Sequence, residues 1–392
     1  MNSPTFHTRW PLIIVLWFCG MGAAMQFAKV SLPIDELQTY YDASLSEMGL
    51  VLSWVGVCGM VFAACVSVFI NRFGYRRLLF LAMFLATVLA WVQVLLPPMP
   101  LLLATRLIEG VSHLIIVVTA PTLMAAACRA DQRSMVMSLW GTFFGVTFSL
   151  LGALSPWLMP MGVTSFFVFH ALWMLVMLVL LALMFRTDLI ALPHPRPQIS
   201  IKNIIEQHVQ IYGQMRTVLP SLCFITYTAL YVALLTFFPK VGGAGPDWLR
   251  AALPLVSLAG AFGAGALVQK GLKPTQTTVV AFGSALVAFL VLAVACQQGL
   301  ELSWFKVATF FTLGLMQGAI YGMIPYLATQ PAQQAQSISA IAQLGNLGST
   351  IGPPLFGIAF GTWGTTGILG LSLLMPVIGL FLIVYFSRKL DN

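Results

Sequence analysis

The chain has 392 residues, of which 59% are hydrophobic and only 8% are charged, whereas a soluble domain carries about 25% charged residues. Apolar runs of about twenty residues recur along its whole length, and about 20 helical residues cross the hydrocarbon core of a bilayer. The composition therefore excludes a soluble globular fold and predicts an all-α, multi-pass membrane protein, because a backbone in lipid must satisfy its own hydrogen bonds.

Twelve apolar runs are predicted to be transmembrane helices. They are residues 10–32, 47–70, 78–96, 100–124, 134–156, 164–185, 217–238, 248–269, 275–296, 303–327, 338–360 and 367–386. A cytoplasmic N-terminus places fourteen of the 19 Lys and Arg residues on the inner side, which is the bias that inner loops show, and both termini are then cytoplasmic. This topology explains the net charge of +8, so no nucleic-acid partner is expected.

The first run carries Gln26 and Lys29 about one turn apart near its predicted outer end. The stretch after Arg9 also has features of a signal peptide, but its removal would leave an odd number of helices and reverse the charge bias. Lys29 either lines a central cavity or extends its ammonium to the outer surface, and both interpretations stay open. In the first of these, Gln26 and Lys29 bind substrate.

A basic turn follows the second run, where residues 71–77 read NRFGYRR. The glycine permits a tight reversal, and basic charge is favoured on the cytoplasmic side. The segment resembles the G-xxx-D-R-x-G-R-R signature of the major facilitator superfamily, in which the acid and the next arginine latch onto the other half of the protein. Asn here replaces that acid, so the resemblance implies a weakened latch, and a purely topological role of the arginines is the alternative. The latch residues are Asn71, Arg72, Gly74, Arg76 and Arg77.

The fourth run carries Arg106, Glu109, Gly110 and His113 at a spacing that places them on one helical face. Charges at this depth face a bundle interior or a watery cavity, because exposure to lipid is costly. Residues 106–110 resemble the superfamily's R-x-x-Q-G motif, and the resemblance places this face on the central cavity. We expect Arg106 to bind substrate and Glu109 and His113 to carry a coupling proton. The alternative is a fixed Arg106–Glu109 ion pair with His113 in a packing role.

The longest link, residues 186–216, is about thirty residues and leaves no room for a soluble domain between the runs. We predict an N-terminal six-helix bundle (1–186), a cytoplasmic linker with an amphipathic helix (187–216) and a C-terminal six-helix bundle (217–392). Gly110 and Pro121 in the fourth run have the same spacing as Gly314 and Pro325 in the tenth, which indicates two duplicated halves.

The second half has no acidic residue within its predicted spans. Tyr227 and Tyr231 share one face of the seventh run, and Gln317 and Tyr321 share one face of the tenth. We expect these four to contact substrate, with core packing as the alternative for each. Two further residues are expected outside the site. Lys306 is predicted to extend to the outer surface, and His170 to be interfacial or to serve in packing.

The resemblance covers essentially the whole chain and implies a secondary transporter whose two pseudo-symmetric halves expose a central site to each side in turn. Positive charge at Lys29 and Arg106 favours a small organic anion or zwitterion as substrate, with coupling to protons. A proton-driven efflux pump for lipophilic drugs or metabolites is the alternative. Direction of transport and symport or antiport stay open.

An enzyme would need more catalytic groups than one Arg–Glu–His face, and a sensor would usually carry a signalling domain. The six cysteines show no CxxC spacing, so neither a zinc site nor a disulfide framework is indicated. The expected driving force is a proton gradient, without metal or organic cofactor. The expected partners are the solute and membrane lipids, and the protein is expected to be monomeric in a bacterial inner membrane.

Overall fold

The computed structural model describes residues 7–63, 73–187 and 201–391, which form helices and, within these ranges, no strand. Ten of these described helices are long and apolar enough to cross a membrane, and a bent pair makes an eleventh at most. The predicted all-α membrane fold is therefore confirmed. The count of twelve spans and the cytoplasmic position of the termini stay predictions.

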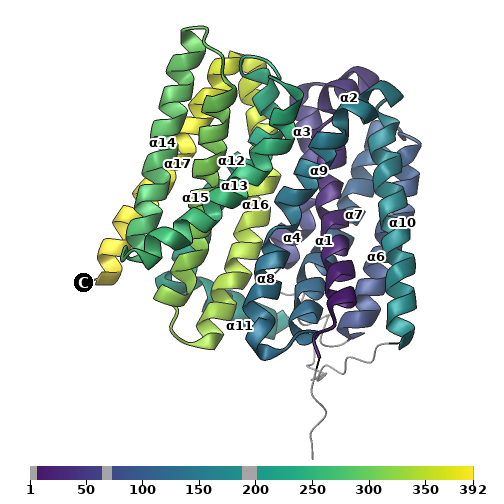
Figure 1. The fold of residues 1–392 in the computed structure, drawn as a ribbon, viewed down its shortest axis with the longest axis horizontal. Helices are drawn as coiled ribbons and strands as arrows, with labels where there is room; N and C mark the ends of the chain where they lie inside the picture. Colours follow the sequence, from purple (N-terminus) through teal and green to yellow (C-terminus); the bar gives the residue numbers. More distant parts are fainter. Residues whose placement is uncertain (1–6, 64–72, 188–200, 392) are drawn as a thin grey trace, which may run out of the picture.

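The helices gather into two groups that lie side by side (Figure 1). The first group contains α1 (Trp10–Ser31), α2 (Ile34–Tyr41), α3 (Leu45–Ser53), α4 (Gly56–Phe62), α6 (Tyr75–Val94), α7 (Met99–Ala126), η1 (Ala130–Gln132), α8 (Arg133–Gly141), α9 (Phe143–Leu158), η2 (Met159–Met161) and α10 (Thr164–Thr187). The second contains α12 (Met215–Phe237), η3 (Phe238–Lys240), α13 (Asp247–Gln269), α14 (Pro274–Gln297), α15 (Ser303–Leu327), α16 (Pro331–Trp363) and α17 (Thr365–Asp391).

A short helix, α11 (Ile201–Tyr212), lies at the end of the molecule where α1 begins, here called the terminal end; α2 marks the opposite, distal end (Figure 1). The side chains of Ile205 and Val209 are 57% and 65% exposed, as in an amphipathic surface helix. Partial burial raises the pKa of Tyr212, so its hydroxyl stays protonated and donates to Gln343 Oε1 at 2.9 Å. This bond ties α11 to α16.

Local sequence accounts for several helix boundaries. At the start of α3, the Ser44 hydroxyl accepts from the Glu47 N–H at 3.2 Å, and the Glu47 carboxylate accepts from the Ser44 N–H at 2.7 Å. This reciprocal pair satisfies N–H groups that a helix start leaves free. Gly74 has a φ of 86° just before α6, a conformation that favours glycine, as the tight reversal there requires.

Two predicted spans differ from single straight helices. In place of 47–70, α3 and α4 form a pair bent by 51°, with residues 64–70 outside the described part. In place of 134–156, α8 ends at Gly141 and α9 begins at Phe143. The predicted span 338–360 lies within α16, which has 33 residues but is not among the ten apolar helices.

The two groups meet mainly where α16 lies against α3 and α4, and where α13 lies against α9. Small residues allow this approach, since a Cβ added at Gly49 would lie 2.8 Å from the Pro353 carbonyl oxygen. At the distal end, the Ser31 and Thr236 hydroxyls are 2.6 Å apart and join α1 to α12. The halves are therefore held together at the distal end.

Candidate functional site

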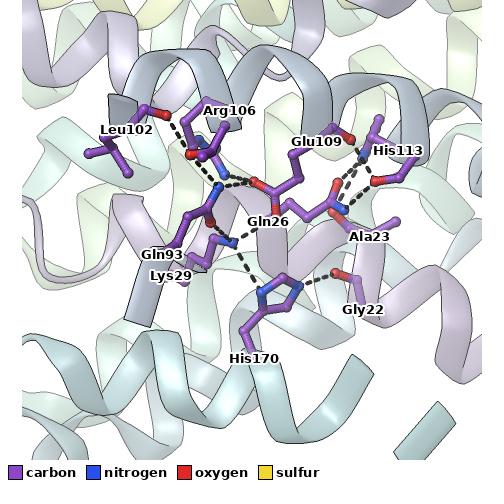
Figure 2. Close-up of polar contacts among 12 residues, drawn as sticks. Gly22, Ala23, Gln26, Lys29, Gln93, Leu102, Arg106, Glu109, His113 and His170 are labelled. Atoms are coloured by element: carbon purple, nitrogen blue, oxygen red, sulfur yellow. Dashed lines mark hydrogen bonds and ion pairs between the residues drawn. The ribbon is translucent and has the colours of Figure 1, made fainter. Parts of the chain in front are cut away.

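Lys29, near the distal end of α1, is fully buried and lies at the centre of a polar cluster (Figure 2). Its ammonium donates to Gln93 Oε1 at 2.5 Å, to Glu109 Oε1 at 2.7 Å and to His170 Nδ1 at 3.0 Å. These three bonds use the full donor capacity of an ammonium. Lys29 therefore points into the first half, so of its two interpretations the extension to the outer surface is wrong, and substrate contact stays a prediction.

The Glu109 carboxylate on α7 faces two cations. Its Oε1 accepts from Lys29, and its Oε2 accepts from Arg106 Nη1 at 2.5 Å and from Gln93 Nε2 at 3.1 Å. Arg106, Glu109 and Lys29 are all 0% exposed. The Arg106–Glu109 pair predicted from the sequence is present, and Lys29 of α1 joins it.

The contacts of His170 fix its protonation. An ammonium only donates, so His170 Nδ1 accepts from Lys29 and the ring proton lies on Nε2, which donates to the Gly22 carbonyl at 3.2 Å. His170 is thus a neutral, fully buried partner inside the first half, so the interfacial role is wrong, and the packing role stays open. The polar cluster, as used below, consists of Lys29, Gln93, Arg106, Glu109 and His170.

The polar cluster carries an excess of positive charge. Two cations, Lys29 and Arg106, face one carboxylate, while Gln93 and His170 are neutral. Every ion pair in a low-dielectric interior costs desolvation energy, and an uncompensated charge costs more. A net charge of about +1 without solvent contact is an expensive way to fill space, and it points to a role beyond packing.

His113, one turn beyond Glu109, contacts different groups. Its Nδ1 lies 3.0 Å from Gln26 Oε1 and 3.2 Å from the Ala23 carbonyl oxygen, so this nitrogen carries the proton and donates to both. The amide of Gln26 donates in turn to the Ser112 hydroxyl at 3.3 Å. The structure thus brings Gln26 and His113 together beside the polar cluster (Figure 2).

The predicted tyrosines of the second half, together with Phe224, form a row of aromatic rings in contact. Centroids of Tyr227 and Tyr231 are 5.4 Å apart, those of Phe224 and Tyr227 are 5.3 Å apart, and those of Phe224 and Tyr321 are 5.4 Å apart. These four residues are the aromatic row. Tyr227 is 3% and Tyr321 is 43% exposed, so the row passes from buried to accessible along its length. Gln317, one turn before Tyr321 on α15, is partly exposed.

Two phenylalanines connect the halves. The ring of Phe144 on α9 lies 6.2 Å from that of Tyr231 and 6.0 Å from that of Phe27. Phe27 in turn lies edge-on to the imidazole of His113 at 5.3 Å. A continuous line of ring contacts therefore runs from His113 in the first half to Tyr321 in the second.

The predicted latch residues are only partly described. Asn71 and Arg72 lie outside the described residues. Arg76 donates to the Phe185 carbonyl, and its guanidinium lies 4.5 Å from the Phe185 ring centroid, so it ties α6 to α10 within the first half. Arg77 is exposed.

Lys306 on α15 corrects another prediction. It is 2% exposed and donates to the carbonyls of Phe238 at 3.0 Å and Gly243 at 2.8 Å, instead of reaching the outer surface. A cavity of about 70 Å³ lies beside it, between the distal ends of the halves. Among the described residues, those lining this cavity include Asp35 and Arg250 but none of the polar cluster.

The sequence analysis missed Gln93, His170 and Phe144 as members of the site. A signal existed for the first two, because an amide or imidazole inside an apolar run needs a buried hydrogen-bond partner. Phe144 had no such signal, since phenylalanine is common in every span.

Two helical groups that meet along α16, with an ionic cluster enclosed in one of them, define an all-α membrane protein with two halves. The family model described as "Major Facilitator Superfamily" matches residues 12–353, and the chain belongs to this superfamily. A search of curated proteins finds no match.

Two similar solved structures are of a bacterial homolog to the human lysosomal transporter Spinster. The inward-facing, unoccupied one is 13% identical with a TM-score of 0.68, and the match covers 99% of this chain and 96% of that chain. The inward-facing, occupied one is 14% identical with a TM-score of 0.72, covering 99% and 97%. At these identities the similarity shows the fold alone.

Proposed function

We propose that the protein is a secondary active transporter that moves a small organic anion or zwitterion by alternating access, with proton coupling at Glu109. The observation that carries the proposal is the excess positive charge of the buried polar cluster, where Lys29 and Arg106 share one carboxylate. A substrate carboxylate or phosphate that reaches the two cations would compensate this charge. Membrane transport itself follows from the superfamily.

Proton and anion binding are linked in this arrangement. Glu109 and an anionic substrate compete for the same donors on Lys29 and Arg106. Protonation of Glu109 releases those donors, so the proton strengthens anion binding, and by reciprocity the anion strengthens proton binding. One proton with one monovalent anion carries no net charge, which suits movement through an apolar interior.

The aromatic row supports a substrate with an apolar body. Tyr227 and Tyr231 present ring faces, and Phe144 continues the line of rings towards Phe27 and the first half. Gln26 and Gln317 supply hydrogen-bonding amides near the two ends of this line. A ligand whose anionic group meets the cations and whose apolar part lies on the rings uses both halves, as alternating access requires.

The first experiment screens ligands by thermal shift on the purified protein, because a ligand that binds the folded state raises its apparent stability. We expect aromatic carboxylates to raise Tm more at about pH 6 than at about pH 8, by the linkage above. Glu109→Gln should retain the shift at both pH values and lose its pH dependence. Stabilisation by lipophilic cations, with none by acids, would contradict the proposal.

The second experiment measures uptake into proteoliposomes with an imposed pH gradient, using the acid that gives the largest thermal shift. Wild-type protein should accumulate the acid, whereas Glu109→Gln should exchange it across the membrane without accumulation. Accumulation by Glu109→Gln at the wild-type level would remove Glu109 as the coupling group and leave His113 as the next candidate.

Efflux of lipophilic compounds is the second candidate function. The observation that favours it is the aromatic row itself, which has no charged side chain among its four members. Under this alternative, neutral or cationic aromatic compounds give the largest thermal shifts, and Lys29 serves only the structure of the first half.

A further inference from the structure

The bend between α3 and α4 has no proline to cause it. The two helices are bent by 51°, yet residues 45–62 contain no proline. Sharp kinks without proline arise where a side chain or water enters the backbone hydrogen-bond ladder, at a π-bulge or at a Gly/Ser pair. Ser53 and Gly56 flank the break, and a side chain from another helix also contacts it.

Arg106 of α7 enters the ladder at this point. A continuous helix would give the carbonyls of Val51 and Leu52 to the N–H groups four residues later. In this structure Arg106 Nε donates to the Val51 carbonyl at 2.9 Å, and Arg106 Nη2 donates to the Leu52 carbonyl at 3.2 Å. Beyond the break, the Val57 N–H donates to the Trp54 carbonyl at 3.3 Å, a three-residue spacing.

Gly110 allows α7 to approach the same break. A Cβ at this position would lie 2.4 Å from the Val55 carbonyl oxygen, so a larger residue would force the backbones apart. Arg106 and Gly110, the two ends of the segment that resembles the superfamily motif, therefore both contact the break.

The third contact of Arg106 is with Glu109. Its Nη1 donates to Glu109 Oε2 at 2.5 Å, so one guanidinium spans the carboxylate and both backbone carbonyls. The charged and titratable groups that face this carboxylate are Lys29 from α1 and, through Lys29, His170 from α10; His113 of α7 lies one turn away. The charge of Glu109 therefore affects how firmly Arg106 is held against the two backbone carbonyls.

Both parts of the bent helix, α3 and α4, pack against α16 of the other half. In α3, Gly49 approaches the Pro353 carbonyl, and in α4 the Met60 carbonyl accepts from Gln343 Nε2 at 3.0 Å. Helix α4 has seven residues and is about 10 Å long. Loss of the 51° bend would move its far end by roughly 9 Å, which the contact with α16 would have to follow.

We propose that Arg106 is the positioning residue of a hinge in the second transmembrane segment, and that the charge of Glu109 sets this hinge. The Arg106 guanidinium stabilises the α3–α4 bend through its bonds to two carbonyls, and the Glu109 carboxylate keeps the guanidinium in place. Neutralising Glu109 frees the guanidinium from its anchor, relaxes the bend and shifts α4 along α16. This deepens the proposed function by linking proton binding to movement between the halves, whereas the arginine-held bend rests on its own contacts.

The test measures the distance between α4 and α16 by pulsed electron paramagnetic resonance in lipid nanodiscs. Spin labels are attached at Phe62→Cys and Ile338→Cys, whose native side chains are 51% and 53% exposed, in a background without the native cysteines. Arg106→Lys keeps the charge, but one ammonium lacks the planar fork that reaches a carboxylate and two carbonyls together. We expect a new distance population displaced by several ångströms; an unchanged distribution would overturn the hinge.

A rescue variant separates the hinge from general damage. Val55 has φ −59° and ψ −34°, which proline can adopt. Proline there would also clash with the Val51 carbonyl and so enforce a bend without the arginine. Arg106→Lys combined with Val55→Pro should restore the wild-type distances, and failure to restore them in a folded double variant would count against the hinge.

Glu109→Gln tests the charge dependence on the same labels. We expect the displaced population to appear at neutral pH, as in wild-type protein under acidic conditions. Unchanged distances in Glu109→Gln would overturn the link to Glu109, even if Arg106→Lys moves them. The pH dependence of ligand binding is measured separately, so a failure of the proposed transport coupling is distinguishable from a failure of the hinge.

Discussion

Each half of the molecule buries one lysine near the distal end of a helix, and the two lysines have different surroundings. Lys29 in the first half donates to an amide, a carboxylate and an imidazole. Lys306 in the second half donates to two backbone carbonyls, that of Phe238 at the end of α12 and that of Gly243 in the loop after η3. A cation at the C-terminal end of a helix is stabilising by itself, so Lys306 is explained by the fold. The fold alone does not explain Lys29, because its partners are polar side chains whose acceptor atoms would lose their ammonium donor without it.

The largest expected effect is that of Lys29→Met. This change leaves the Glu109 carboxylate with one cation and removes the donor from Gln93 Oε1 and His170 Nδ1. Glu109 keeps Arg106 as its partner, so the loss comes from the broken Lys29–Glu109 bond and from the two acceptors left without a donor, about 1–3 kcal/mol for each. We expect a loss of this size in unfolding free energy, measured by denaturation in detergent, and loss of the thermal shift by carboxylates.

Lys306→Met is the matched control for that experiment. It removes donors from two carbonyls without breaking an ion pair, so about 1–3 kcal/mol is expected. Ligand binding should persist in this variant with its pH dependence intact. Equal losses of ligand binding in Lys29→Met and Lys306→Met would contradict the proposal that only Lys29 takes part in binding.

Gly110→Ala should have the next largest effect. Its Cβ would lie 2.4 Å from the Val55 carbonyl oxygen, and backbone on both sides must move. Overpacking of this kind costs about 1–3 kcal/mol, and the α4–α16 distance should change with it. Gly283→Ala on α14 is the control, since a Cβ there meets nothing within 4 Å. It should be neutral or stabilise the helix by about 0.5–1 kcal/mol.

Much of this comparison could be predicted from the sequence. Length and hydropathy of the runs predict the helices, and the spacing of Arg106, Glu109 and His113 predicts one polar face, because both depend on local periodicity. Lys29 and Glu109 were identified as candidates, but Gln93 and His170 were not, since they come from the third and sixth predicted spans. Which distant residues meet is a property of the packing.

Lys306 and the α3–α4 bend also show which features could not be predicted from the sequence. The acceptors of Lys306 are the carbonyl of Phe238 at the end of α12 and that of Gly243 in the following loop, which no pattern around Lys306 itself reveals. The break after Ser53 is held by an arginine from α7, so the run 47–70 looked like one uninterrupted span. Local sequence patterns predict the helices, but the surroundings of a residue such as Lys306 depend on contacts between helices that are distant in the sequence.

Tyr321→Ala is expected to affect binding more than stability. Its side chain is 43% exposed and touches Phe224, so its removal leaves little unsatisfied. An aromatic contact contributes about 0.5–1.5 kcal/mol, which corresponds to roughly a 2- to 12-fold weaker Kd for an aromatic acid. Tyr326→Ala, on the same helix and 41% exposed, is the control and should leave Kd unchanged.

The smallest effect is expected at the distal end, where Lys240 Nζ of the second half lies 2.6 Å from Asp35 Oδ1 of the first. Asp35 is 55% exposed, and exposed ion pairs contribute about 0–1 kcal/mol. Asp35→Asn should therefore leave Tm nearly unchanged while modestly raising the labelling of a cysteine at Ser31, which lines the same distal cavity as Asp35. High salt should produce the same rise in the protein with Asp35 intact, because screening weakens an exposed pair. If Asp35→Asn instead lowers stability and ligand binding as much as Lys29→Met does, the distal ion pair matters as much as the buried cluster, and the contrast between the two halves fails.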